Sequence, residues 1–138
     1  MVQMNVTYLG DLQCQARHHD SGSSLTTDAP KDNQGQGRSF SPTDLLGVSM
    51  ATCMATIMGI VARREGIDLA GMNVNVEKQM SSNAPRRIAK LTVAFHIPAD
   101  LPMSQREMLE RAARTCPVHH SLHPDVQIDL SFAFGAAG

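Results

Sequence analysis

Aromatic residues are scarce in this chain of 138 residues, which has no Trp, one Tyr and four Phe. The hydrophobic core must therefore be built from aliphatic side chains and nine flexible Met, without the aromatic surfaces on which proteins stack bases or sugars. An excess of positive charge is also absent, because 12 Lys and Arg are balanced by 13 Asp and Glu. We therefore expect no nucleic-acid partner, since such proteins usually carry a basic patch.

Cysteine is too rare, and at three residues odd in number, for a disulfide scaffold. The first residues, MVQMNVTYLGDLQ, contain neither the basic nor the apolar region of a secretory signal, so we expect a cytoplasmic protein. With 42% hydrophobic and 18% charged residues, the composition is that of a folded globular protein. The length predicts a single domain over residues 1–138.

One apolar run could be either a membrane span or a buried helix. Leu45–Ala62 carries no charge over its 18 positions, and Arg63 and Arg64 follow it. Two Gly, one Ser, two Thr and three Ala nevertheless make the run only mildly apolar. We therefore expect a helix that is surrounded by its own protein, and no association with a membrane.

Both ends of this helix are marked in the sequence. Ser41, Pro42 and Asp44 predict a capping box, in which Ser41 is the N-cap and Asp44 reaches back to its N–H. Gly66 predicts the end of the helix. Such a helix is about 35 Å long. It is too long and too apolar for a monomer of this size, so we expect it to lie between two sheets or to be shared across a dimer.

Alternation of apolar and polar residues predicts strands on both sides of the helix. Residues 2–18 predict a hairpin, and a short strand is expected at Leu25–Asp28. After the helix we expect, in the order strand, strand, helix, helix and strand, residues 72–80, 87–97, 104–115, 117–122 and 126–134. Because strands and helices are grouped rather than strictly alternating, the predicted fold class is α+β with antiparallel sheets.

Two of the cysteines are candidates for chemistry. Cys53 lies in the middle of the long helix, where a free Cys usually packs as a small hydrophobic residue. Cys116 precedes Pro117 at the predicted start of a helix, where the helix dipole and free N–H groups stabilise a thiolate and lower its pKa. The residues alone leave open whether Cys116 is a reactive thiol or only a helix cap.

A group of histidines follows this cysteine. Cys116 with His119, or His119 with His123, has the spacing of metal ligands along a helix. No fourth ligand is evident, and the adjacent His119 and His120 point in different directions. We therefore expect solvated or hydrogen-bonded histidines, and neither a bound metal nor a cofactor.

Several segments together resemble a known family. SFSPTDLLGVSMATCM, followed 63 residues after Cys53 by CPVHHSL, resembles the OsmC/Ohr superfamily of thiol-dependent hydroperoxide reductases. TDAPKDNQGQG, VEKQM and the turn at Pro85 to Arg87 are similar to one less characterised OsmC-like branch. The resemblance covers nearly the whole chain. It implies an OsmC-like fold and an intertwined homodimer, in which two long central helices are enclosed by two sheets.

The resemblance also implies roles for the cysteines. Cys53 matches the peroxidatic cysteine, whose thiolate attacks an organic hydroperoxide and becomes a sulfenic acid. Cys116 matches the resolving cysteine, which condenses with the sulfenic acid to a disulfide that an external dithiol then reduces. Cys14 lies in no motif, and we expect it to be a bystander.

The groups that would activate the thiolate depart from the family pattern. The well-studied peroxidases place a glutamate ten residues before the peroxidatic cysteine, and here that position is Thr43. Asp44, nine residues before it, lies about half a turn away around a regular helix, which favours capping over catalysis. For the arginine that these peroxidases use, Arg17 is our candidate, with Arg38 and Arg87 as rivals. These departures keep a second hypothesis open, a non-enzymatic OsmC-like dimer that binds a small apolar ligand.

Overall fold

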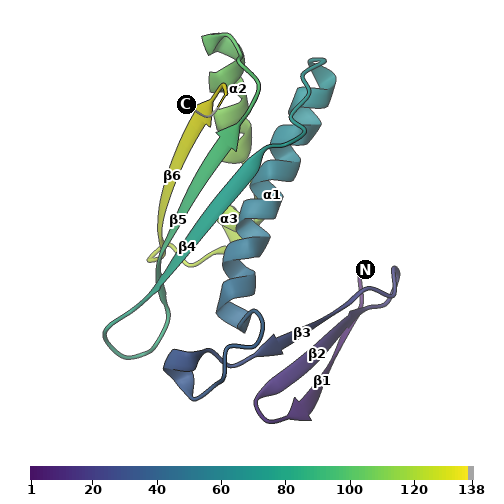
Figure 1. Ribbon diagram of the computed structural model, residues 1–138, viewed down its shortest axis with the longest axis vertical. Helices are drawn as coiled ribbons and strands as arrows, with labels where there is room; N and C mark the ends of the chain where they lie inside the picture. Colours follow the sequence, from purple (N-terminus) through teal and green to yellow (C-terminus); the bar gives the residue numbers. More distant parts are fainter. Residues whose placement is uncertain (137–138) are drawn as a thin grey trace. The chain divides into compact units, whose positions relative to one another are not determined.

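The structure is a computed structural model that describes residues 1–136. The chain divides into two compact units, Met1–Leu46 and a second that begins at Gly47. Each unit contains its own three-stranded sheet, and helix α1 (Pro42–Arg64) runs across the boundary between the units (Figure 1). The single domain expected over residues 1–138 stays a prediction.

The first unit is an antiparallel sheet in the order β1 (Met4–Gly10), β2 (Gln13–His18), β3 (Ser24–Asp28), which confirms the predicted hairpin and short strand. Val6 pairs with Ala16, which in turn pairs with Leu25. Paired residues point to the same side of a sheet, so these apolar side chains share one face. A short 3-10 turn, η1 (Lys31–Asn33), lies in the loop that leads from β3 to α1.

Helix α1 begins and ends where the sequence predicts. The Ser41 N–H donates to the Asp44 carboxylate over 2.8 Å, and the Asp44 N–H donates to the Ser41 hydroxyl over 3.1 Å, so the capping box is confirmed. At the other end, Gly66 has a φ of +68°. The Gly66 N–H donates to Arg63 O and the Ile67 N–H to Ala62 O, which is the double hydrogen bond of a Schellman motif.

The second unit holds a sheet in the order β4 (Asn73–Met80), β5 (Ile88–Ile97), β6 (Gln127–Phe134). Strands β4 and β5 are antiparallel, as expected, but β6 pairs parallel to β5. The reason is the connection between them. Helices α2 (Met103–Ala113) and α3 (Pro117–Ser121) carry the chain back to the start of β5, and only such a crossover can join parallel neighbours.

The core of the second unit lies between its sheet and its helices. Along β5 the side chains of Leu91, Val93, Phe95 and Ile97 are buried, and they pack with buried residues of α1 and α2: Met50, Met54, Met58, Ala62, Leu109 and Ala113. Three of these are methionines one helical turn apart, which form an adaptable surface against the sheet. By length and a mean hydropathy of 2.0, α1 could cross a membrane, but its methionine face is packed as in the core helix of a globular protein.

Candidate active site

Cys116 lies at the start of α3 and is completely buried. Its thiol donates to the Met50 carbonyl of α1 over 3.9 Å, and its sulfur accepts the His119 N–H over 3.4 Å. The second contact makes Cys116 the N-cap of α3, as the Cys-Pro pair predicts. The buried thiol is therefore held from both sides, by its own helix and by α1.

Cys53 lies on α1, three residues after Met50, and is half-buried at the edge of the core. Its thiol lies close enough to the Cys116 thiol to raise the pKa of that group. The two residues are 63 positions apart in the sequence. The crossover through α2 and α3 brings Cys116, at the start of α3, next to the part of α1 that carries Cys53. The structure thus joins the two cysteines that the sequence motifs single out.

Burial raises the pKa of the Cys116 thiol, and the hydrogen bond to Cys53 raises it further. The backbone N–H of His119 opposes this shift but does not overcome it. The lowered pKa expected for Cys116 is therefore wrong. Helix α3 has only five residues, and the desolvation of a completely buried sulfur outweighs what so short a helix and its N–H groups supply. Cys116 is a protonated thiol at neutral pH.

Asp44, the nearest carboxylate before Cys53 in the sequence, serves the helix cap. One of its oxygens accepts the Ser41 N–H, which is the first free donor of α1. The sequence left a choice between capping and catalysis for this residue, and the observed bonds are those of the cap.

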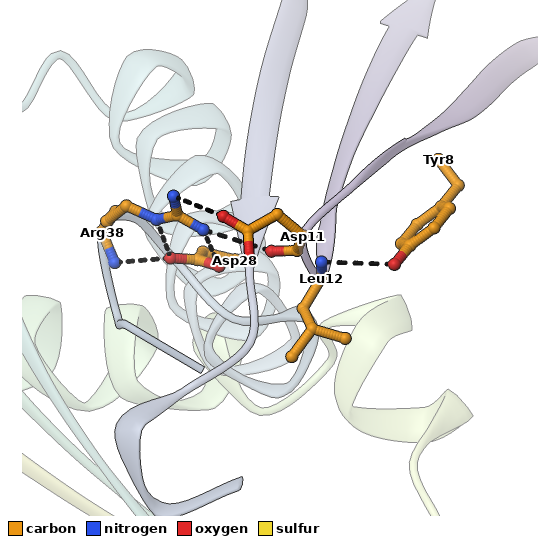
Figure 2. Close-up of polar contacts among 5 residues, drawn as sticks. All are labelled: Tyr8, Asp11, Leu12, Asp28 and Arg38. Carbon is orange, nitrogen blue, oxygen red and sulfur yellow. Dashed lines mark hydrogen bonds and ion pairs between the residues drawn. The ribbon is translucent and has the colours of Figure 1, made fainter. Parts of the chain in front are cut away.

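Arg38 forms ion pairs with two aspartates of the first unit, Asp28 and Asp11 (Figure 2). Its guanidinium binds Asp28 through Nε at 2.7 Å and Nη2 at 3.2 Å, and it binds the Asp11 carboxylate through Nη1 at 3.1 Å. The Arg38 backbone N–H also donates to Asp28, whose side chain is completely buried. These bonds lower the pKa of Asp28 to about 2. Figure 2 also shows Tyr8, whose hydroxyl accepts the Leu12 N–H in the same hairpin turn.

The two other candidate arginines differ in their surroundings. Arg87 donates through Nη1 to Asn83 and to the Pro85 carbonyl, so it is occupied in its own β4–β5 loop. Arg17 is an exposed residue of β2, and among the residues that the structure describes it forms no ion pair. Arg38 and Arg87 thus use their guanidinium groups in bonds within their own units, whereas no such bond is shown for Arg17 in the described part of the chain.

The histidines after Cys116 do not form a metal cluster. Over residues 1–136, no group of three or more His, Cys, Asp or Glu side chains could hold a metal ion. His123 instead accepts the Asp125 N–H. The expectation that His119 and His120 point in different directions is wrong, because their rings stack with 5.8 Å between the centroids. In the described part of the chain, the ligand-like spacing of Cys116, His119 and His123 is therefore not accompanied by a group of side chains that could bind a metal ion.

Two features of the site escaped the sequence. Asp28 stands at the end of a short strand, where a charged residue is normally exposed, and nothing local shows that it is buried beneath Arg38. The Nδ1 atom of His119 is buried and makes no hydrogen bond within the described part of the chain. Neither feature has a local signal, because each depends on segments that meet only in the folded chain.

Comparison with known proteins identifies related sequences and folds. A family model described as OsmC-like protein matches residues 35–131. A crystal structure from Psychrobacter arcticus, named for osmotic stress induction and a detoxification response, is 43% identical, with a TM-score of 0.91 over 96% of each chain. No curated protein matches the chain.

More distant crystal structures share the fold. The organic hydroperoxide resistance protein OsmC of Legionella pneumophila is 19% identical, with a TM-score of 0.77 over 96% of each chain. An organic hydroperoxide resistance protein of Vibrio cholerae, with captopril bound in one of its active sites, is 22% identical. Its TM-score is 0.73, over 94% of the present chain and 90% of its own.

Proposed function

Because this chain belongs to the OsmC-like family, we propose that it is a thiol-dependent peroxidase that reduces organic hydroperoxides through Cys53 and Cys116. The family match confirms the resemblance that the sequence motifs indicated, and the α+β fold confirms the predicted fold class. Distant structures with the same fold are named organic hydroperoxide resistance proteins, which supports the proposed substrate class.

The observation that carries the proposal is the proximity of the two thiols, which share one core and interact electrostatically. Cysteines 63 residues apart meet in one core, with one half-buried and the other completely buried. Residues meant only for packing would not need to be paired, whereas a disulfide-forming mechanism requires this proximity.

Their different burial assigns the roles. Cys53 is the more accessible of the two and is proposed to attack the hydroperoxide. Its thiolate takes the terminal oxygen, the O–O bond breaks, and the electron pair leaves on the other oxygen, which gains a proton to form the alcohol. Cys116, a buried and protonated thiol, is suited to the second step, in which it attacks the sulfenic sulfur and water leaves. An external dithiol then reduces the disulfide, as a reducing cytoplasm permits.

For the arginine that stabilises the thiolate we propose Arg17. Arg17 is preferred because the two other candidates already have partners. Arg38 binds Asp28 and Asp11, and Arg87 binds residues of its own loop. For Asp44 the bond of its carboxylate to the Ser41 N–H favours capping over a part in the chemistry.

We propose that the working form is a homodimer. On the first sheet, the side chains of Met4, Val6, Tyr8 and Leu25 are 46–68% exposed and share one face, and on α1 Ile60 is 44% exposed. Apolar faces of this extent mark interfaces, and a second copy offers the same surface in return. Sedimentation equilibrium should give twice the chain mass. Val6→Glu should yield monomers, whereas Thr7→Glu, on the opposite face of the same strand, should not.

The peroxidase proposal is tested with cumene hydroperoxide and dithiothreitol. Wild-type protein and the matched control Cys14→Ser should consume the peroxide at similar rates. Cys53→Ser should lose turnover, and Cys116→Ser should accumulate a sulfenic acid that dimedone traps. A Cys53→Ser protein that consumes the peroxide at the wild-type rate would refute the proposal.

One observation favours the non-enzymatic alternative, a dimer that binds a small apolar ligand. A cavity of about 170 Å³ lies beside α1 and β4 in the second unit, and all but one of its lining residues are apolar: Val48, Ala51, Thr52, Ala55, Val74 and Val76. Native mass spectrometry separates the two functions. A stoichiometric bound alkyl compound, together with wild-type peroxide consumption by Cys53→Ser, would favour binding over catalysis.

A further inference from the structure

His18, the last residue of β2, is in hydrogen-bonding distance of two groups at one ring nitrogen. The Ser21 backbone N–H donates to His18 Nδ1 over 3.2 Å, and the Ser21 hydroxyl lies 2.7 Å from the same atom. A backbone N–H can only donate, so Nδ1 must carry a lone pair and the ring proton must be on Nε2. The imidazole is therefore neutral when the turn between β2 and β3 has this shape.

This turn is closed by backbone bonds around the same residue. The His18 N–H donates to Ser23 O over 2.8 Å, and the Gly22 N–H donates to His18 O over 2.9 Å. The Ser21 hydroxyl also accepts the Ser23 N–H over 3.1 Å. Ser21 is thus held at its backbone N–H and at its hydroxyl, and the ring nitrogen of His18 is a partner of both.

The side chain of Arg17 lies against this turn. A Cβ built on Gly22 would stand 3.9 Å from Arg17 Nη2, which is van der Waals contact. Arg17 and His18 also line one hollow of about 210 Å³ on the first sheet, together with four apolar residues: Met4, Val6, Ala16 and Leu25. The shape of the turn therefore decides where the guanidinium can lie.

Protonation of His18 removes the acceptor in the turn, because an imidazolium carries a proton on both ring nitrogens. The Ser21 hydroxyl can rotate and accept the new Nδ1–H, but the Ser21 backbone N–H cannot, so the turn has to open. The ring then also carries a positive charge next to that of Arg17. The other titratable side chains of the turn, His19 and Asp20, are exposed, and the residues beside His18 on β1 and β3 are uncharged.

We propose that His18 is a pH-dependent positioning residue for Arg17. The neutral ring keeps the turn closed against the guanidinium, and the protonated ring opens the turn and releases it. Histidine changes its charge between about pH 5 and pH 8, so Arg17 is held at pH 8 and released as the pH falls toward 5. This inference rests on the proposed peroxidase function, in which Arg17 stabilises the Cys53 thiolate, and adds a regulation of it.

The turn itself is tested by ¹H–¹⁵N NMR spectra of the full chain between pH 8 and pH 5. The Ser21 amide resonance should move along a single titration curve, because its acceptor disappears. In His18→Asn the resonance should stay in place, since the Asn Oδ1 takes the position of Nδ1 and accepts at every pH. The matched control is His19→Asn, which changes the exposed histidine next in the chain and should leave the Ser21 titration as in wild type.

The effect on Arg17 is tested by single-turnover consumption of cumene hydroperoxide by reduced protein, which needs no dithiol. Wild type and His18→Asn should react at equal rates at pH 8. At pH 5 wild type should be about fivefold slower than His18→Asn, the factor for one hydrogen bond of ordinary strength. His18→Ala lacks the acceptor at every pH, so it should be about fivefold slower than wild type at pH 8 and equal to it at pH 5. Because proteins are compared at one pH, protonation of Cys53 itself cancels.

A merely structural role for His18 is separated by repeating the series in an Arg17→Met background, where the differences between the His18 variants should vanish. Differences that persist there, a Ser21 resonance that does not move in wild type, or a His18→Asn protein as sensitive to acid as wild type would each overturn the inference. The peroxidase proposal fails separately. If wild type consumes no peroxide at either pH while the Ser21 resonance still titrates only in the presence of His18, the pH-dependent turn stands without that function.

Discussion

Oxidation of the cysteine pair should stabilise the protein by an amount that follows from its position in the chain. Diamide removes two electrons and two protons from two neighbouring thiols. In Cys14→Ser protein it should therefore link Cys53 and Cys116, whose thiols lie near each other. The new bond closes a loop of 63 residues. On the chain-entropy model, a loop of that size gives about 4 kcal/mol, because the crosslink restricts the unfolded chain.

The assay is urea unfolding followed by circular dichroism, with oxidised and reduced samples at one protein concentration, since the midpoint of an oligomer depends on concentration. With a slope of roughly 2 kcal/mol per molar urea, the oxidised midpoint should rise by about 2 M. The single variants Cys53→Ser and Cys116→Ser are the controls, and diamide should leave their midpoints unchanged.

Two results would refute the reasoning. If mass spectrometry of the oxidised protein shows both thiols free, or linked only between chains, the two sulfurs do not lie close enough to react with each other. If the bond forms and the midpoint falls, the native geometry cannot accommodate the disulfide, and a mechanism that passes through it at every turnover would be untenable.

Three further predictions concern an ion pair, a buried methionine and a helix end. The pKa of Asp28 is lowered to about 2 by Arg38. Its contribution to stability should therefore be complete above pH 4 and lost as the pH falls through 2, and urea midpoints of Asp28→Asn should lack this acid dependence. Met54→Ala should cost about 2–5 kcal/mol and Met54→Leu less than about 1.5, because Met54 is completely buried; a similar cost for both would contradict its packing. Gly66→Ala should lower the thermal midpoint through strain of about 1 kcal/mol at positive φ, whereas Gly59→Ala, in open helical space, should raise it.

Local chemistry made much of the fold predictable. The capping box, the Gly66 terminus and the period-2 strands depend on residues within a few positions of one another, and each is found within about two residues of its expected place. The direction of β6 could not be predicted in this way, because it is decided by the end of the sheet to which α2 and α3 return the chain. Alternation of side chains is the same in parallel and antiparallel strands.

In the candidate site, too, some features follow from local sequence and others from tertiary contacts. The sequence by itself singled out Cys53 and Cys116 as the candidate cysteines, since their motifs are local, and it determined that Asp44 had a helix to cap. Only the tertiary structure decided the state of Cys116, because the pKa of a thiol follows its desolvation, and burial is created by contacts with α1 from 63 residues away. It likewise decided that Arg38 is held by Asp28 and Asp11, since a guanidinium binds whichever carboxylates the folded backbone brings to it.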